Sequence, residues 1–274
     1  MALAALGVTG TAGACQQPVT ASAGTHHPVS THRPPSAKHR ASPSPAPSPS
    51  DYPGDTTSAS WGSPVVAENF NGTRLDPAKW VVYNSPNDRV NPRTSSATRL
   101  SRGALTLTGG LYGGRDLSGG IASTLNQRYG RWEVRLKAGR GVGYSAVALL
   151  WPERMGHPEY AEIDFAEIID PTRQGAGIFI HHGPADNQAQ NVARADFTKW
   201  HVVAVDWLPD RLTFWLDGKV VWTYRGPLIP HLGRMGLALQ NDQVCDRGPG
   251  FCRNHTTPKW VTMSVDWVKI YHAP

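Results

Sequence analysis

The segment that most constrains the fold is the run Tyr-Ala-Glu-Ile-Asp-Phe-Ala-Glu-Ile-Ile at residues 160–169. Apart from its three acids, this run is apolar, aromatic and β-branched, which is typical of a buried strand. Carboxylates are rarely buried without a partner, because removing water from a charge costs several kcal/mol. Glu162, Asp164 and Glu167 therefore need a chemical reason to stand where they do.

The alternation of side chains along a strand decides which of these acids share a face. Successive side chains point to opposite faces, so Glu162 and Asp164 point the same way. Strict alternation would turn Glu167 to the other face. One extra residue, a β-bulge at Phe165 or Ala166, returns it to the side of the other two, and bulges are common beside active sites. The sequence thus predicts a row of acids on one face of a central strand.

The chain from residue 61 onward is dominated by short strand patterns separated by Gly, Pro and Asn turns. Asp217-Gly218 between two such runs indicates a hairpin with a type I′ turn. The clearest predicted strands are residues 104–108, 130–137, 147–151, 200–207, 211–216, 219–224 and 261–271. No 3.6-residue period holds for twelve residues. About a dozen strands of this kind predict an all-β fold, a two-sheet antiparallel sandwich.

The first sixty residues differ in texture from the rest. Residues 16–60 are rich in Pro, Ser, Thr, Ala and His, which predicts a disordered linker. Residues 1–15 are read as a signal segment, because Ala12-Gly13-Ala14-Cys15 resembles the lipobox of bacterial lipoproteins. Lipidation of Cys15 would attach an exported protein to the outer face of the membrane. Cleavage and release, or a free buried cysteine, are the alternatives. No stretch has the ~20 apolar residues of a membrane-spanning helix.

The remaining cysteines and the charge bound the environment and the partners. Cys245 and Cys252 stand in a Gly/Pro-rich stretch at a spacing that can close a small disulfide loop. The formal charge is +6, but the basic residues are scattered and form no stripe with interleaved aromatics. Nucleic acid is therefore not expected as a partner. We expect a monomer.

The acid row suits two kinds of chemistry. Cleavage of a glycoside uses two carboxyl groups that flank the bond, one protonated and one ionised. Glu162 and Glu167 would be separated by roughly 13 Å between Cα atoms, at about 3.3 Å per strand residue, and both side chains are long enough to lean toward a substrate. Asp164 between them would separate their pKa values. A cation site is the rival reading, less favoured because the acids lie on a strand and not in a wrapping loop.

The six residues 162–167, Glu-Ile-Asp-Phe-Ala-Glu, resemble the E-x-D-x-x-E signature of glycoside hydrolase family 16, the laminarinase-like enzymes, in its bulged form. Further similarity is found, in the family's order, at residues 70–80, 129–137, 200–207, 217–218 and 265–271. The resemblance spans residues 65–272, so residues 61–274 are identified as one catalytic domain. It implies a concanavalin A-like β-jelly-roll with a catalytic cleft on its concave sheet.

The resemblance also implies roles for the acids. Glu162 would be the nucleophile that forms a glycosyl-enzyme. Glu167 would be the general acid that protonates the leaving oxygen and then the base that activates water. Asp164 would assist between them. No cofactor follows from this reading apart from a structural calcium, for which Glu68 and Asp266 are possible counterparts.

Substrate contacts are predicted at three further positions. His181 fits a histidine that lines the family's cleft, with a hydrogen-bonded structural histidine as the alternative, and Trp151 and Tyr160 are candidate sugar platforms. The strand before the motif lacks the Trp-Pro-Ala-x-Trp pattern that is common in the family. The expected function is a retaining endo-glycosidase acting on a β-linked polysaccharide, with β-1,3-glucan the leading substrate. A transglycosylase and a non-hydrolytic carbohydrate-binding protein are the alternatives.

Overall fold

The computed structural model of the protein describes residues 61–154 and 160–274. The predicted signal segment, the linker and the lipidation site at Cys15 lie outside the described residues. Within them, no helix is both long and apolar enough to cross a membrane.

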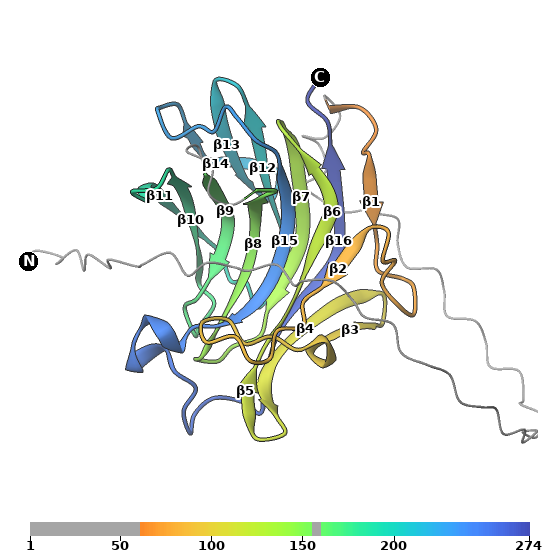
Figure 1. The fold of residues 1–274 in the computed structure, drawn as a ribbon, viewed down its shortest axis with the longest axis vertical. Coiled ribbons are helices and arrows are strands. Elements are labelled where there is room, and N and C mark those ends of the chain that lie inside the picture. The colour runs from red at the N-terminus through yellow and green to blue at the C-terminus, as the bar shows by residue number, and fades with distance from the viewer. Residues whose placement is uncertain (1–60, 155–159) are drawn as a thin grey trace, which may run out of the picture.

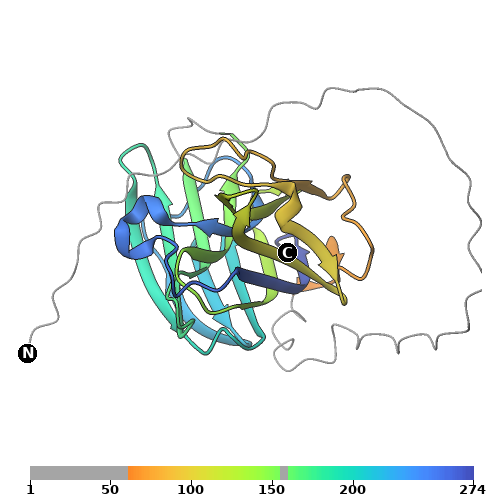
Figure 2. The same cartoon turned by 90° about the horizontal axis from the view of Figure 1, so that it is seen from below.

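Two antiparallel sheets pack face to face and form the layers seen in Figures 1 and 2. Sheet A has nine strands, in the order β14-β13-β12-β7-β16-β4-β3, with β1 paired to β16 and β5 paired to β4. Sheet B has seven strands, in the order β11-β10-β9-β8-β15-β6-β2. The predicted all-β jelly-roll sandwich is confirmed, because all the pairings between the named strands are antiparallel and the chain crosses repeatedly between the two sheets.

The strand bounds show where local signals were sufficient. The strands are β1 (Val66–Glu68), β2 (Trp80–Val82), β3 (Thr98–Ser101), β4 (Ala104–Tyr112), β5 (Arg115–Leu117), β6 (Gly119–Gln127), β7 (Gly130–Ala138), β8 (Tyr144–Pro152), β9 (Ala161–Ile168), β10 (Gly175–His182), β11 (Asn187–Arg194), β12 (His201–Leu208), β13 (Arg211–Leu216), β14 (Lys219–Tyr224), β15 (Met235–Gln243) and β16 (Trp260–Tyr271). Short 3-10 turns are η3 (Ser95–Ala97), η4 (Cys245–Arg247) and η5 (Pro249–Phe251). Four of the strands that the sequence does not predict, β1, β2, β3 and β5, have only three or four residues, which leaves too few alternations to recognise. The other four, β6, β10, β11 and β15, have eight or nine residues and do not alternate clearly between apolar and polar side chains.

The main core lies between the sheets and follows from the alternation of the strands. On β7, Trp132, Val134 and Leu136 are fully buried in it, and on β9 Ile163 and Phe165 join the same cluster. Each such side chain contributes about 1.5–3 kcal/mol through the removal of apolar surface from water. The intervening residues of both strands are left to face outward, which places the acids of β9 on the outer face of sheet B.

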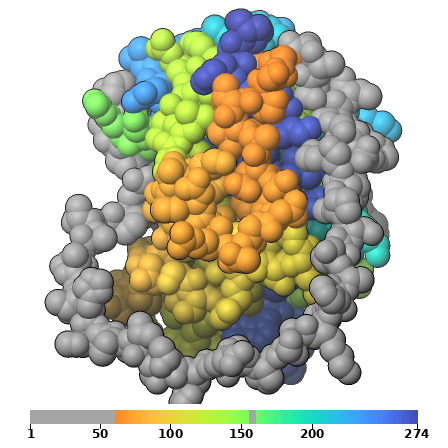
Figure 3. Space-filling view, turned by 90° about the vertical axis from the view of Figure 1, so that its right-hand side faces the viewer, coloured from red at the N-terminus to blue at the C-terminus, as the bar shows by residue number. Residues whose placement is uncertain are grey.

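Two local features tie the sandwich together. The predicted turn between β13 and β14 is confirmed, because Asp217 and Gly218 have φ values of 49° and 74°, as a type I′ turn requires. At the other side of the molecule, β1 pairs with β16, so the start and the end of the described domain lie side by side, orange against blue in Figure 3.

Candidate active site

A β-bulge in β9 places the acids. Ala148 of β8 pairs with Ala166, and the next residue, Leu149, pairs with Asp164. Phe165 therefore has no partner on β8, and both Phe165 and Ala166 turn into the main core. The bulge that the sequence predicts at this point is confirmed.

The neighbouring strand shows that the bulge returns the third acid to the face of the other two. On β10, every second residue pairs with one of the acids. The pairs are His181 with Glu162, Phe179 with Asp164 and Gly177 with Glu167. Because alternate residues of a strand share a face, all three acids lie on the outer face of sheet B, which we call the acidic face.

The floor of the acidic face is apolar. Val147, Leu149 and Trp151 of β8 pack with Ala238 of β15 and with Tyr160 in a cluster separate from the main core. This explains why every residue of β8 is buried: one set of its side chains faces the core and the other lies under the acidic face. The acids therefore stand on a surface that offers little hydration.

Glu162 is half-buried in this surroundings, and the Tyr160 hydroxyl donates to its Oε2 atom at 3.3 Å. Burial raises the pKa of Glu162 well above its usual value, and the charges of Asp164 and Glu167 raise it further, whereas His181 and the Tyr160 hydrogen bond lower it. A partly buried glutamate beside other carboxylates ionises less readily than a glutamate in water. Glu162 therefore retains its proton more strongly than an isolated glutamate would.

His181 lies between two carboxylates. Its Nδ1 atom is 2.8 Å from Oδ1 of Asp186, and its Nε2 atom is 3.5 Å from Oδ2 of Asp164. Burial lowers the pKa of His181, but the hydrogen bond and charge of Asp164, with Glu162 and Asp186, raise it to about 9. Asp186 is itself held by Nε2 of Gln188 at 2.6 Å. The protonated imidazole supplies positive charge to the acid row.

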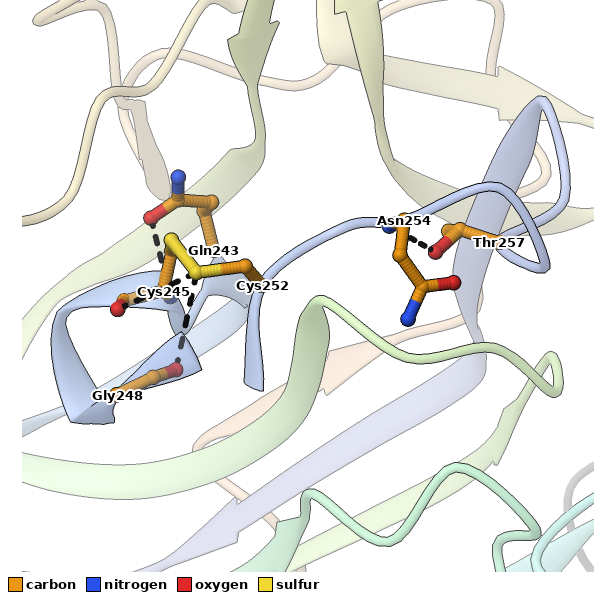
Figure 4. The surroundings of a disulfide bond; sticks show 6 residues. All are labelled: Gln243, Cys245, Gly248, Cys252, Asn254 and Thr257. Atoms are coloured by element: carbon orange, nitrogen blue, oxygen red, sulfur yellow. Dashed lines mark hydrogen bonds between the residues drawn. A yellow bond between two sulfur atoms is a disulfide. The ribbon is translucent and has the colours of Figure 1, made fainter. Parts of the chain in front are cut away.

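Glu167 has a cationic partner that comes from a distant segment. The Arg247 guanidinium at the end of η4 donates to Oε1 of Glu167. A disulfide between Cys245 and Cys252 closes the segment around Arg247 (Figure 4), as the cysteine spacing predicts. Burial raises the pKa of Glu167, Arg247 lowers it, and Asp164 raises it, with a net upward shift.

Comparison with known proteins places this geometry in a family. The sequence model of glycosyl hydrolases family 16 matches residues 82–228, more than half of the chain. The chain belongs to glycosyl hydrolases family 16. The match includes the three acids, both strands that flank them and His181.

Individual relatives of this family 16 chain are distant. A "Beta-glucanase" of Acetivibrio thermocellus is 27% identical over 168 residues, which are 59% of this chain and 48% of the relative. A "Crh-like protein 2" of Aspergillus fumigatus is 26% identical over 156 residues, or 51% of this chain and 32% of the relative. The chain thus spans about half or less of the length of these curated relatives.

Solved structures support the family 16 fold. The laminarinase catalytic domain of Thermotoga maritima matches with a TM-score of 0.67 and 17% identity, over 77% of this chain and 98% of that one. The laminarinase of Rhodothermus marinus matches with a TM-score of 0.66 and 20% identity, over 77% and 97%. At these identities the likeness concerns the fold alone.

The predicted sugar platforms lie beside the acids, in an arrangement that also serves the acids themselves. The rings of Trp151 and Tyr160 meet edge to face with centroids 5.9 Å apart. Trp151 is only 7% exposed, so most of its surface is already covered by protein. Tyr160 is half-buried and uses its hydroxyl on Glu162. Stacking of sugars on either ring stays a prediction.

The possible calcium ligands already have protein partners. Oε1 of Glu68 accepts a hydrogen bond from the Phe70 backbone at 2.9 Å, and Asp266 forms an ion pair with Arg135. Among residues 61–154 and 160–274, no group of three or more His, Cys, Asp or Glu side chains could hold a metal ion. As placed, these residues do not fit a calcium site, and calcium binding stays a prediction.

Sequence reasoning missed three members of the site. Arg247 and Asp186 come from loops whose position relative to β9 has no local signal. Phe179 could have been found from register, because it lies two residues before His181 on the same face. Its ring lies over Gly177, where an added Cβ atom would overlap it, so the glycine leaves room for an aromatic ring beside Glu167.

Proposed function

We propose that the protein is a retaining endo-glycosidase that hydrolyses a β-linked polysaccharide, with a β-glucan as substrate and β-1,3-linkages as the leading choice. The observation that carries the proposal is the bulge at Phe165, which brings Glu162, Asp164 and Glu167 to one face over an apolar floor. Glycoside cleavage uses two neighbouring carboxyl groups, one protonated and one ionised, in a site that is partly shielded from water.

In the first step, the Glu162 carboxylate attacks the anomeric carbon. The bond from that carbon to the leaving oxygen breaks, and the oxygen takes the proton of Glu167. The raised pKa of Glu167 favours this step, because the carboxyl group keeps its proton nearer to neutral pH. The pKa of Glu162 is also raised, which opposes its ionisation, and the positive charge of His181 counteracts that shift. The product is an ester between the sugar and Glu162, and the leaving part of the polysaccharide departs with a neutral hydroxyl group.

In the second step, the Glu167 carboxylate takes a proton from water while the water oxygen bonds to the anomeric carbon. The ester bond breaks and its electron pair returns to Glu162. Asp164 and His181 help in both steps, because the protonated imidazole near Asp164 offsets the negative charge of the acid row. Tyr160 holds the attacking carboxylate through its hydroxyl group.

The choice of β-glucan is supported by the relatives and not by the site itself. The curated relative from Acetivibrio thermocellus is called a β-glucanase, and the solved structures from Thermotoga and Rhodothermus are called laminarinases. The strand before the acids carries Trp151 as its single tryptophan. The length of glucan that the protein binds is therefore expected to depend on other side chains of the acidic face.

We also propose that the protein works outside the cytoplasm. The disulfide between Cys245 and Cys252 supports this, because such bonds persist mainly in oxidising compartments. Mass spectrometry of the mature protein from its own cells would show whether its first residue is a lipid-modified Cys15 or an unmodified residue.

The test is a polysaccharide panel with laminarin, mixed-linkage β-glucan, agarose and carrageenan. We expect reducing ends to appear on laminarin, and we expect Glu162→Gln to lower kcat at least about a thousandfold, since it removes the attacking group. Products of even and odd length would indicate internal cleavage. The anomeric configuration of the first product, followed by NMR, should match that of the substrate.

The control is binding without turnover. Glu162→Gln keeps the size of the side chain, so laminarin-oligosaccharide affinity should stay within a few-fold of the wild type. Equal sugar release by the wild type and the variant would overturn the enzymatic proposal. If labelled oligosaccharides become longer and no reducing sugar is released, the reaction is transglycosylation and not hydrolysis.

A further inference from the structure

We propose that Arg247 is a positioning residue that holds Glu167 as an aimed carboxylate and so favours the step in which Glu167 activates water. The inference rests on the proposed function for its catalytic meaning. Its structural half, the control of the proton on Glu167 by Arg247, can be measured without any substrate.

The contact between the two groups is direct and one-sided. Arg247 donates from Nη2 to Oε1 of Glu167, whose side chain is 8% exposed, while the Arg247 side chain is 43% exposed. A charged hydrogen bond to a buried carboxylate is stronger than one to an exposed carboxylate, because little water competes with it. The hydrogen bond therefore fixes Oε1 of Glu167, and the other carboxylate oxygen stays available on the acidic face.

The segment around Arg247 is built to hold this position. Residues 245–252 form two successive 3-10 turns, η4 and η5, and the disulfide joins their two ends (Figure 4). Beyond it, the Asn254 backbone donates to the Thr257 hydroxyl at 2.9 Å. A short cross-linked segment loses less entropy when it orders an arginine than a free loop would.

The other charges near Glu167 do not replace Arg247. Asp164 and Glu162 on β9 are acids, and Asp246 beside Arg247 is another. His181 on β10 is the second cation of the neighbourhood, and it lies against Asp164. Arg247 is thus the positive group that touches Glu167 directly in the described part of the chain.

The two halves of the proposed cycle ask opposite things of Glu167. It must carry a proton when the bond to the leaving oxygen breaks, and it must be ionised when water attacks. Once Glu162 is esterified, its negative charge is gone. Glu167 then experiences less repulsion from neighbouring carboxylates, and the attraction of Arg247 has a larger influence on its protonation. The ion pair then keeps Glu167 ionised until water arrives, and Glu167 takes the proton of that water as the ester bond breaks.

The decisive experiment is an NMR titration of the full chain with ¹³C-labelled glutamate carboxyl groups, in which the Glu167 signal is identified by its loss in Glu167→Gln. In Arg247→Met, we expect the titration midpoint of Glu167 to move up by about one pH unit, the usual effect of losing a contacting cation. Arg247→Lys should restore most of the wild-type midpoint, because it restores the charge.

Arg253→Met is the matched control. This variant removes a positive charge from the residue that follows the disulfide, and Arg253 is 3.5 Å from the Tyr144 hydroxyl and not in contact with Glu167. The inference is overturned if the midpoint is unchanged in Arg247→Met, or if Arg253→Met moves it as far. If Arg247→Met merely disordered the loop, kcat/KM would fall at every pH. The proposal requires instead that the alkaline limb of the kcat/KM profile of this variant move to higher pH.

These outcomes are distinguishable from failure of the proposed function. A wild type that releases no sugar would overturn the glycosidase proposal and leave the titration to decide on Arg247. If the wild type is active and the Glu167 titration midpoint is the same in Arg247→Met as in the wild type, the glycosidase proposal stands and the role of Arg247 is overturned.

Discussion

Both sheets carry buried acids on their outer faces, but the two groups of acids are satisfied differently. On sheet A, Glu133 and Asp206 share the buried Arg131, which donates to Asp206 Oδ1 at 2.6 Å and to Glu133 Oε1 at 2.8 Å. Trp215 donates to the other oxygen of Asp206 at 2.9 Å, and Tyr271 to the other oxygen of Glu133 at 3.3 Å. All four carboxylate oxygens have donors.

On sheet B, the acids of the acidic face have fewer donors. Tyr160 donates to one oxygen of Glu162, and Arg247 to one oxygen of Glu167. In the described part of the chain, the second oxygen of each glutamate is left for a ligand. The difference teaches that burial alone does not mark a reactive acid. An acid whose oxygens are all occupied serves the fold, and an acid with an oxygen left over can serve chemistry.

The largest expected effect is on the sheet A network. Arg131→Met removes the shared cation and leaves two buried carboxylates facing each other, which should cost about 3–5 kcal/mol of unfolding free energy. For a domain of this size, that corresponds to a fall in Tm of roughly 10 °C. Calorimetry would measure it, and activity per folded molecule should be unaffected.

Arg225→Met is the control for this variant. Arg225 follows strand β14 and pairs with the exposed Asp210, and exposed ion pairs contribute at most about 1 kcal/mol. Equal losses of stability in the two variants would mean that the sheet A network does not stabilise the fold as described.

A smaller effect is expected on sheet B, with the opposite sign. Glu162→Gln removes a carboxyl group whose pKa is raised in the folded protein, so near pH 8 the variant should be more stable than the wild type, by about 1.4 kcal/mol for each unit by which folding raises that pKa. Denaturant unfolding at several pH values would measure the difference.

The sign follows from proton linkage. Below the usual glutamate pKa of 4.5, the folded and unfolded states of the wild type both carry the proton on Glu162, and the variant has no advantage from it. As the pH rises through 4.5 toward the raised folded-state pKa, the unfolded state gains from ionisation first. The wild type then loses stability relative to the variant. If the unfolding free energies of the two proteins changed with pH in parallel, the raised pKa of Glu162 in the folded protein would be contradicted.

The smallest effect concerns the packing beside Glu167. Gly177→Ala places a Cβ atom against the Phe179 ring and should push that ring toward Asp164, with less than about a tenfold loss of kcat/KM. In a Phe179→Ala background the same change should have no further effect, because the ring is gone. Additive losses in the double variant would show that the two residues act independently.

The features that could be predicted from the sequence depend on local alternation. The shared face of Glu162 and Asp164, the bulge and the turn at Asp217-Gly218 all follow from counting residues along one or two strands. The disulfide is confirmed for a similar reason, since its cysteines are separated by only seven positions. Local pattern was sufficient for the architecture and for the location of the acids.

The partners of the acids could not be predicted in this way. Arg247 is 80 positions from Glu167, and Arg131 is 75 positions from Asp206. Arginines are scattered through the sequence, and nothing near either one indicates which acid it will meet. Which carboxylates are fully paired and which are left partly unpaired is therefore decided by the packing of distant segments, and it becomes visible only in three dimensions.

The unpaired Phe165 has a consequence for how this site can change over time. Because each residue added to a strand reverses the parity of all that follow, the distance along the chain between Glu162 and Glu167 matters more than the identity of the residues between them. Substitutions at positions 165 and 166 alter packing, whereas loss of one position turns Glu167 into the apolar core and adds an unpaired acid there. Single-residue insertions and deletions, more than point substitutions, are thus the changes to which this strand is least tolerant.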